Sequence, residues 1–226
     1  MNQGNKGFVN LGNKCYMNSA LQCLSHLPEF HPSTMKFMNE CSRSESGDIM
    51  SQWIALQRDM WSEDDNRPLK PMNLVNSFQQ SCQENNYYFE NFHQNDVDEF
   101  ISLFMDMLHQ SIKSSRKITI KGEPVTEIDR LVMKSLVTWK RFFKDDYSYI
   151  IQKFYSQLFS LTSCPECDYI TTNHDPLMVL SLEIPKQAST LIDCIINYTK
   201  TKQLDANNQW TCDKCKKTIQ PETKLM

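Results

Sequence analysis

The spacing of hydrophobic residues divides the chain into a helical first part and a second part that contains strands. Apolar positions recur every three to four residues near residues 17–24, 74–78, 94–112 and 127–143. This is the period of one helix face, so four helices are predicted there. After about residue 145 strands are predicted to take over. The clearest apolar face, that of residues 94–112, consists of Val97, Phe100, Ile101, Phe104, Met105 and Leu108.

Three further elements are predicted in the second part. Residues 154–164 read as a strand that ends at a cysteine, and residues 178–184 alternate apolar with polar side chains, as a half-buried strand does. A short helix follows, because Thr190 and Asp193 match a capping box. The apolar positions behind these predictions are Tyr155, Phe159 and Leu161, then Met178, Leu180, Leu182 and Ile184, then Leu191, Ile192, Ile195 and Ile196.

Composition excludes several classes of protein. With 226 residues, 40% of them hydrophobic, the chain fits one large or two smaller globular domains. The net charge of -3 and the lack of aromatics among the basic residues of 113–124 favour a solvated connection there over a nucleic-acid patch. No apolar run approaches the ~18 residues of a membrane span, and the N-terminus lacks a signal-peptide core. We therefore expect no nucleic acid or membrane partner and a cytoplasmic or nuclear protein.

Four of the nine cysteines form two Cys-x-x-Cys pairs, Cys164 with Cys167 and Cys212 with Cys215. Two such pairs supply the four thiolates of a tetrahedral structural zinc site. A redox pair is expected beside a βαβ pattern, which this sequence does not show. The remaining alternative is that both pairs are reduced and hold no metal.

Residues 7–24 read Gly-Phe-Val-Asn-Leu-Gly-Asn-Lys-Cys-Tyr-Met-Asn-Ser-Ala-Leu-Gln-Cys-Leu. A turn rich in Gly and Asn delivers Cys15 to the first turn of a helix, where unpaired N–H groups and the helix dipole stabilise a thiolate. Asn10 precedes it by one turn and offers an amide donor for an oxyanion. The alternative is a small buried cysteine, the interpretation that we give to Cys23, Cys41, Cys82 and Cys194.

This segment closely resembles the cysteine box of the ubiquitin-specific proteases, with Lys14 where the family usually has Thr and Phe8 where it usually has Leu. The resemblance implies that Cys15 is the catalytic nucleophile and Asn10 an oxyanion-hole donor.

Residues 94–100 taken alone are an acidic helix start. They also resemble the second signature of this family, with Asn95 in place of its second Gln. The resemblance implies that Gln94, Asp96 and Glu99 line the channel for ubiquitin's arginine-bearing C-terminal tail.

Residues 139–212 are similar, in order and spacing, to the fingers of the same family, in which zinc joins the fingertips and the fingers grip ubiquitin. The resemblance implies a zinc ion held by the four paired cysteines. It also implies an α+β, papain-like fold of thumb, palm and fingers, with an incomplete palm. The expected parts are a helical thumb over 1–115, a connecting helix and palm start over 116–153, and zinc-binding fingers over 154–226.

The resemblance implies a thiol-dependent deubiquitinase that cleaves isopeptide bonds after the C-terminal glycine of ubiquitin, with ubiquitin and ubiquitinated proteins as partners.

In the family the catalytic histidine follows the second cysteine pair. The five histidines here precede it, and we expect each to be an ordinary polar or surface residue. One alternative is therefore an inactive ubiquitin-binding fragment or pseudo-protease, and another is a zinc-stabilised interaction module. Ubiquitin linkage preference and oligomeric state stay open. The five are His26, His31, His93, His109 and His174.

Overall fold

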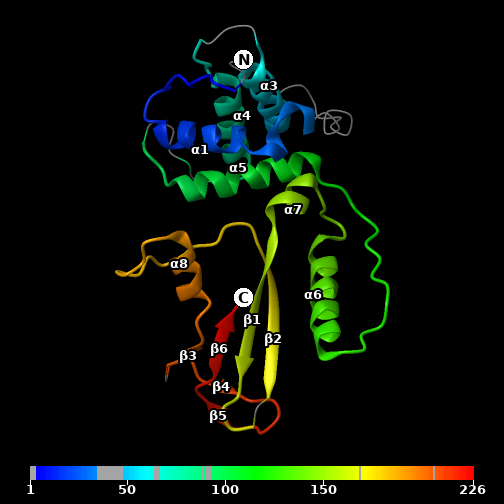
Figure 1. Ribbon diagram of the computed structural model, residues 1–226. Coiled ribbons are helices and arrows are strands. Elements are labelled where there is room, and N and C mark those ends of the chain that lie inside the picture. Colours follow the sequence, from blue (N-terminus) through cyan, green and yellow to red (C-terminus); the bar gives the residue numbers. More distant parts are fainter. Residues whose placement is uncertain are drawn as a thin grey trace. The chain divides into compact units, whose positions relative to one another are not determined.

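The fold is α+β, as predicted, with helices in the first part of the chain and an antiparallel sheet in the second. The computed structural model describes residues 4–34, 48–63, 67–87, 89, 93–167, 169–205 and 207–226. The chain divides into two compact units (Figure 1). Unit 1 consists of Met1–Ser115 and Asp146–Phe154, and unit 2 consists of Arg116–Asp145 and Tyr155–Met226.

Unit 1 is helical, and its longest helix contacts four of the others (Figure 1). That helix, α5, begins at Val97 rather than at the predicted Gln94, because Asp96 has an extended backbone and serves as the N-cap. The other predicted helices of this unit are confirmed. The elements are α1 (Cys15–Ser25), η1 (Pro28–Phe30), α3 (Ile49–Trp61), α4 (Met72–Glu84), α5 (Val97–Ile112) and α7 (Tyr149–Phe154).

Aromatic side chains form the core of unit 1. Trp53 of α3 is fully buried and packs edge-on against Phe30 and Phe104, with ring centroids 5.2 and 5.3 Å apart. Phe104 stacks on Phe100, which packs against Phe78 of α4. The hydrophobic pattern predicts no helix over α3, although α3 supplies the central ring of this core.

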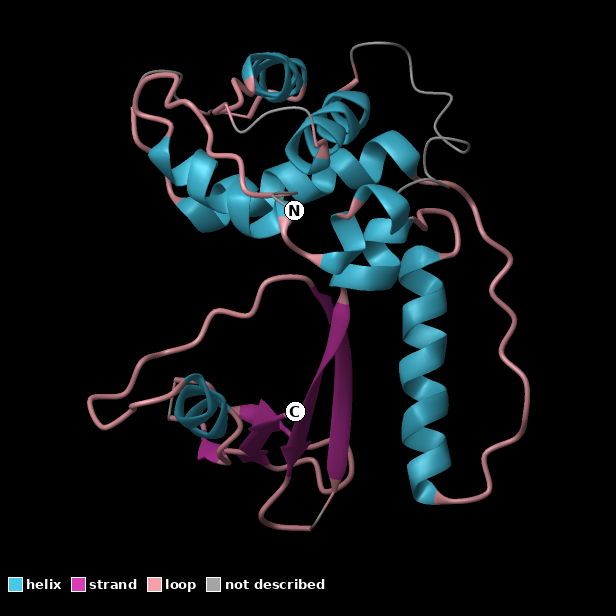
Figure 2. Cartoon of the chain, turned by 45° about the horizontal axis from the view of Figure 1, so that its top comes forward, coloured by secondary structure: helices cyan, strands magenta, loops and turns pink. Residues whose placement is uncertain are grey.

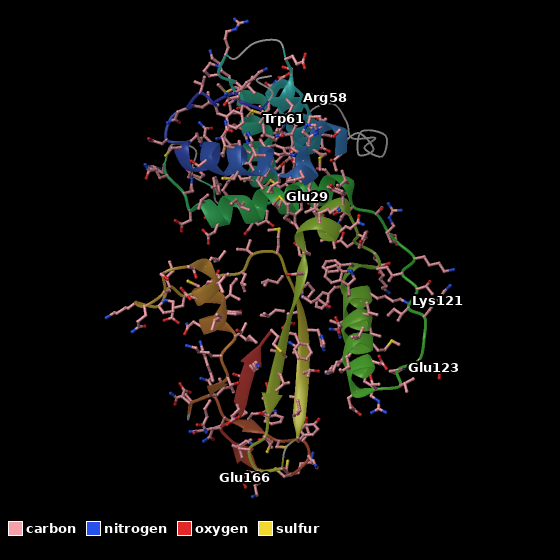
Figure 3. All side chains as sticks on the ribbon, viewed as in Figure 1. Glu29, Arg58, Trp61, Lys121, Glu123 and Glu166 are labelled. Atoms are coloured by element: carbon pink, nitrogen blue, oxygen red, sulfur yellow. The ribbon has the colours of Figure 1, made fainter. Side chains whose placement is uncertain are left out.

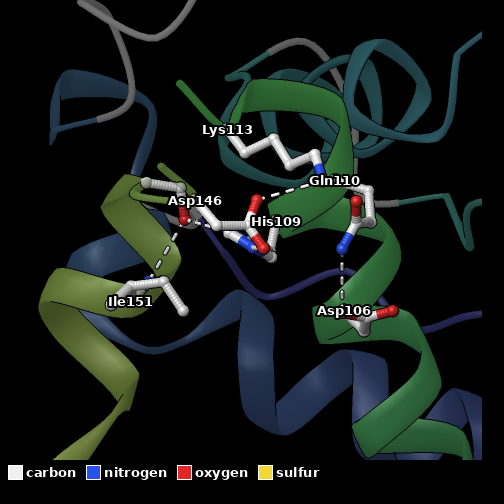
Figure 4. Close-up of polar contacts among 7 residues, drawn as sticks. Asp106, His109, Gln110, Lys113, Asp146 and Ile151 are labelled. Atoms are coloured by element: carbon white, nitrogen blue, oxygen red, sulfur yellow. Dashed lines mark hydrogen bonds and ion pairs between the residues drawn. The ribbon is translucent and has the colours of Figure 1, made fainter. Parts of the chain in front are cut away.

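A polar cluster joins the end of α5 to the start of α7 (Figure 4). His109 is 3% exposed, and its Nδ1 lies 2.7 Å from the Ser148 hydroxyl, while its Nε2 lies 3.5 Å from Asp146. Burial alone would raise the pKa of Asp146, but Lys113 and His109 hold it below its usual value. The prediction of an ordinary polar or surface His109 is therefore wrong in respect of exposure. Its polar partners, Asp146 and Ser148, lie far from it in the sequence, so the sequence pattern does not indicate these contacts.

Unit 2 combines a four-stranded antiparallel sheet, in the order β2-β1-β6-β3, with a separate β4-β5 pair. Strands β1 and β2 form a long ribbon in which Ser156 pairs with Leu177 and Ser163 with Ile170 (Figure 2). None of the described helices is long and apolar enough to cross a lipid bilayer. The elements are α6 (Glu127–Phe143), β1 (Ser156–Ser163), β2 (Ile170–Leu177), α8 (Leu191–Tyr198), β3 (Lys202–Gln203), β4 (Trp210–Thr211), β5 (Thr218–Ile219) and β6 (Glu222–Leu225).

The predicted strand over residues 178–184 is wrong. These residues have no regular secondary structure, and Ile184 is 80% exposed. Strand β1 pairs instead with β6 on one side and with β2, over Ile170–Leu177, on the other, and β2 carries fewer apolar residues than 178–184. Alternation describes which side chains share a face, but a strand also needs a neighbour for its backbone N–H and C=O groups.

The helices of unit 2 form where predicted, but their apolar faces are not buried. Each begins at a capping box, from Thr126 and Asp129 in α6 and from Thr190 and Asp193 in α8. The polar side chain of Lys134 in α6 contacts the β1–β2 ribbon, where its Nζ donates to the Thr172 hydroxyl at 2.8 Å. Phe143 of α6 and Cys194 of α8 are buried, but ten apolar side chains of the two helices are exposed. They are Ile128, Leu131, Val132, Leu136, Val137 and Phe142 of α6, and Leu191, Ile192, Ile195 and Ile196 of α8.

His174 of β2 is also buried, at 2% exposed, against the prediction of an ordinary polar or surface residue. Its ring packs edge-on against Phe159, directly opposite on β1, with centroids 4.7 Å apart. Burial lowers the pKa of His174, and the charge of Lys134 lowers it further. A neutral imidazole therefore serves here as a packing residue.

Candidate functional site

The segment before α1 is anchored from two directions. The Val9 N–H donates to the Leu69 carbonyl at 2.8 Å. From the helix, the Asn18 amide donates to the Val9 carbonyl at 3.3 Å and the Gln22 amide to the Lys6 carbonyl at 2.8 Å. Asn18 and Gln22 lie one turn apart and share a face of α1, so the helix holds this segment along its side.

A left-handed turn places Cys15 at the helix start. Gly12 has φ 86° and Asn13 has φ 47°, a region that glycine and asparagine enter most readily. Cys15 is the first residue of α1 and is exposed. The first-turn N–H groups have no helical partners, so the positive end of the helix lies at the thiol. The predicted placement of Cys15 at a helix start is confirmed, while its catalytic role stays a prediction.

We expect Gly12→Ala to destabilise unit 1 by about 1–2 kcal/mol, because an L-residue resists the left-handed conformation. Gly7→Ala is the matched control, since a methyl group at either position meets no atom within 4 Å and Gly7 has no positive φ. Denaturant unfolding of both variants measures the difference. Equal losses at the two positions would contradict this account.

The Asn10 side chain is held in one orientation. Its Oδ1 accepts a hydrogen bond from the Lys14 backbone N–H at 3.1 Å. Because the amide is planar, fixing its oxygen also fixes its NH₂ group, which is the donor that an oxyanion hole requires. Lys14 itself is 4% exposed, and burial lowers its pKa.

The other cysteines outside the two pairs divide into buried and exposed. Cys82 and Cys194 are buried as predicted, and burial raises the pKa of Cys82 to about 11. Cys23 is exposed, so its predicted burial is wrong: it lies on the side of α1 opposite to the core-facing residues. Cys41 lies outside the described residues.

The acidic start of α5 does not use Asp96 as a side-chain cap. Asp96 is the N-cap by backbone conformation, yet its side chain makes no capping hydrogen bond. Glu99 lies in the first turn, and Gln94, Asp96 and Glu99 are all exposed. The carboxylates therefore favour the helix only through its dipole, which leaves them accessible to a cationic ligand.

Tyr16 brings Cys15 and the acidic start of α5 together. The Asn95 amide donates to the Tyr16 hydroxyl at 3.2 Å, and the Tyr16 ring packs edge-on against Phe100 of α5. Burial raises the pKa of Tyr16, and the charges of Cys15 and Glu99 raise it further. Cys15 directly precedes Tyr16 in α1, so the bond from Asn95 joins the start of α1 to the residues that precede α5. Neither Tyr16 nor Asn95 is among the predicted site residues, although each is adjacent to one of them.

The two cysteine pairs meet at the end of the β1–β2 ribbon, where Figure 3 labels Glu166 within the first pair. The four Sγ atoms all lie within 4.8 Å of one another. Cys164 and Cys215 are 3.9 Å apart, and Cys167 and Cys212 are 3.6 Å apart. A tetrahedron with Zn–S bonds of ~2.3 Å has edges of ~3.8 Å, so the cluster fits a closed four-thiolate zinc site.

The backbone of the second pair supports metal binding. Burial alone would raise the pKa of Cys212, but N–H groups of Cys215 and Lys214 lower it to about 7. Burial raises the pKa of Cys167 to about 12, although the Tyr169 N–H acts in the opposite direction. Lys217 pairs with Glu166 at 2.6 Å and so joins the two turns. A metal ion would replace the protons that these thiols otherwise hold.

Four of the five histidines are engaged by groups other than Cys15. The His26 ring contacts the Gln22 and Gly4 carbonyls, and His31 contacts the Ser33 hydroxyl. His109 and His174 are buried as described above. His93 is exposed. It lies two residues before Asn95, whose side-chain amide donates to the His93 carbonyl at 3.4 Å.

A family model and related proteins of known sequence identify the same family for this chain. A family model described as "Ubiquitin carboxyl-terminal hydrolase" matches residues 6–223. The chain is 30% identical over 236 residues to ubiquitin carboxyl-terminal hydrolase 4 of Candida glabrata, which covers 97% of this chain and 26% of that protein. It is 30% identical over 224 residues to ubiquitin carboxyl-terminal hydrolase 2 of Rattus norvegicus, covering 95% and 35%. The chain thus spans about a quarter to a third of these relatives.

Two solved structures are similar in fold. One is the SAGA Ubp8/Sgf11/Sus1/Sgf73 DUB module bound to ubiquitin aldehyde, with a TM-score of 0.66 and 23% identity over 99% of this chain and 44% of that one. The other is a SAGA DUB module bound to monoubiquitin, with a TM-score of 0.68 and 22% identity over 99% and 45%.

Proposed function

This chain belongs to the ubiquitin carboxyl-terminal hydrolase family, and we propose that it acts as a thiol-dependent deubiquitinase with Cys15 as the nucleophile. One observation carries the proposal. An exposed cysteine at a helix start is linked, through Tyr16 and Asn95, to the acidic start of a second helix. A thiol for acyl transfer and carboxylates for a basic substrate tail therefore occur side by side.

The reaction is acyl transfer followed by hydrolysis. The Cys15 thiolate attacks the carbonyl carbon of the terminal glycine of ubiquitin, and the Asn10 amide donates to the oxyanion that develops. Collapse of this intermediate releases the lysine amine, which takes up a proton, and leaves ubiquitin as a thioester on Cys15. Water then hydrolyses the thioester. Proton transfer in both steps needs a histidine, which in this family follows the second cysteine pair.

The tail channel and the zinc site supply binding. Gln94, Asp96 and Glu99 receive the arginine-bearing tail of ubiquitin through charge-assisted hydrogen bonds. Zinc bound by Cys164, Cys167, Cys212 and Cys215 supports the fingers, which grip the body of ubiquitin. Ubiquitin in two structurally similar modules supports the choice of partner, and ubiquitinated proteins are the substrates. The described cysteines form no disulfide, which favours a reducing compartment, the cytoplasm or nucleus.

Protection of Cys15 by ubiquitin tests this function. We expect saturating ubiquitin to slow the alkylation of Cys15 by iodoacetamide, measured by mass spectrometry of the peptide that contains it. Cys23 is exposed on the same helix and serves as an internal reference that stays reactive. Ubiquitin without its terminal Gly-Gly is the control ligand. Unchanged alkylation of Cys15 at saturating ubiquitin would refute the proposed function.

Asp96→Asn separates tail binding from helix formation. We expect the half-protecting ubiquitin concentration to rise about three- to tenfold, because one charge-assisted contact is lost. The effect should shrink at high salt. Because the Asp96 side chain makes no capping hydrogen bond, the melting temperature should stay nearly unchanged. Asp98→Asn, in the same turn, is the matched control. A loss of stability that accounts for the weaker binding would show that Asp96 only supports the helix.

A further inference from the structure

Residues 93–96 approach α5 without regular secondary structure, so helix hydrogen bonds do not fix their side chains. The Asn95 amide donates to the local His93 carbonyl at 3.4 Å and to the Tyr16 hydroxyl at 3.2 Å. The second bond connects the segment to another helix, across 79 positions of sequence. Its acceptor is the side chain that directly follows Cys15.

The direction of Asn95 also determines the directions of its neighbours. Asp96 has an extended backbone, with φ −69° and ψ 136°, and successive side chains of extended chain point to opposite faces. The exposures agree, because Gln94 and Asp96 are exposed while Asn95 is half-buried. With Asn95 turned toward Tyr16, the two proposed tail-binding side chains face the other way, into solvent.

We propose that Tyr16 and Asn95 are a positioning pair, whose hydrogen bond sets the acidic start of α5 against Cys15 and thereby tunes affinity for the basic tail of ubiquitin. This inference rests on the proposed function. Tyr16 suits the task because its ring is held against Phe100 of α5 at a centroid distance of 6.0 Å. The apolar contact brings the two helices together, and the hydroxyl sets the orientation of residues 94–96.

The test uses Tyr16→Phe, Asn95→Ala and the double variant in the ubiquitin protection assay. Tyr16→Phe keeps the ring and removes only the hydrogen-bond acceptor. Each single variant should raise the half-protecting ubiquitin concentration about three- to tenfold, the range for one net hydrogen bond. The double variant should bind ubiquitin no more weakly than the weaker-binding single variant, because both substitutions remove the same hydrogen bond. Asn95→Gln retains the amide donor and should recover part of the affinity.

Tyr149→Phe is the matched control, because it also removes one tyrosine hydroxyl from unit 1, which donates to the Glu29 carbonyl at 3.1 Å. It should change stability without changing ubiquitin affinity or the alkylation of Cys15 without ubiquitin, which should stay within about twofold of the wild type. If ubiquitin protects the wild type and Tyr16→Phe equally, the positioning role is wrong and the proposed function stands. Equal weakening by Tyr149→Phe, or additive effects in the double variant, would also overturn it. If ubiquitin does not protect the wild type, both fall.

Discussion

Removal of zinc is expected to unfold the β4–β5 pair and the adjoining end of the β1–β2 ribbon. Structural zinc in small sites contributes ~10–16 kcal/mol of apparent binding free energy, which exceeds the stability of most domains. Unit 2 has little else to replace it. Among its described residues the buried apolar side chains are those of Phe143, Cys164, Cys194, Cys212 and Pro221, and two of these belong to the metal cluster.

Elemental analysis and thermal unfolding measure this expectation. The purified chain should contain one zinc per molecule, and a chelator should abolish the unfolding transition of unit 2 while unit 1, with its aromatic core, persists. Cys212→Ser should lose most of the metal. Cys23→Ser, which changes an exposed cysteine of unit 1, should lose none. Clearly less than one zinc per chain, or a Cys212→Ser protein with full metal content, would contradict the site.

The second large effect concerns turnover. We expect residues 1–226 alone to be alkylated at Cys15 by small electrophiles but to react slowly, or not at all, with a ubiquitin probe that carries a C-terminal electrophile. A thiol at a helix start is accessible and electrostatically favoured. Hydrolysis also needs a general base and acid, whose loss typically costs ~10²–10⁴-fold. In the family this group is a histidine that follows the second cysteine pair, and His93, which precedes the acidic start of α5, is the alternative within residues 1–226.

Two comparisons decide whether the chain needs a further histidine. Adding a C-terminal polypeptide that carries the family's histidine and palm strands should restore labelling and cleavage by orders of magnitude. His93→Ala should have little effect once that polypeptide is present. Rapid cleavage of a ubiquitin conjugate by residues 1–226 alone would show the prediction wrong. If His93→Ala then abolished the activity, His93 would be the base. Ubiquitin binding without any turnover, with or without the added polypeptide, would favour the pseudo-protease.

The sequence by itself determined the features that depend on neighbouring residues. Helix α6 occupies the predicted range, and the capping box of Thr190 and Asp193 starts α8, because caps and helix faces are set within one or two turns. The Gly-Asn turn before Cys15 has the left-handed conformation that its composition favours. Each Cys-x-x-Cys pair likewise forms its own local turn. The proximity of the two pairs in space agrees with the expected fingers.

Only the tertiary structure decided which side chains meet across long stretches of sequence. Residues 178–184 have the alternation of a strand but no described pairing partner, while less apolar β2 pairs along its whole length with β1. His109 and His174 are buried because Ser148 and Phe159 lie beside them in space. The bond from Asn95 to Tyr16 has the same origin. Periodicity indicates that a face is apolar or polar, whereas the partner that covers it depends on how distant segments pack.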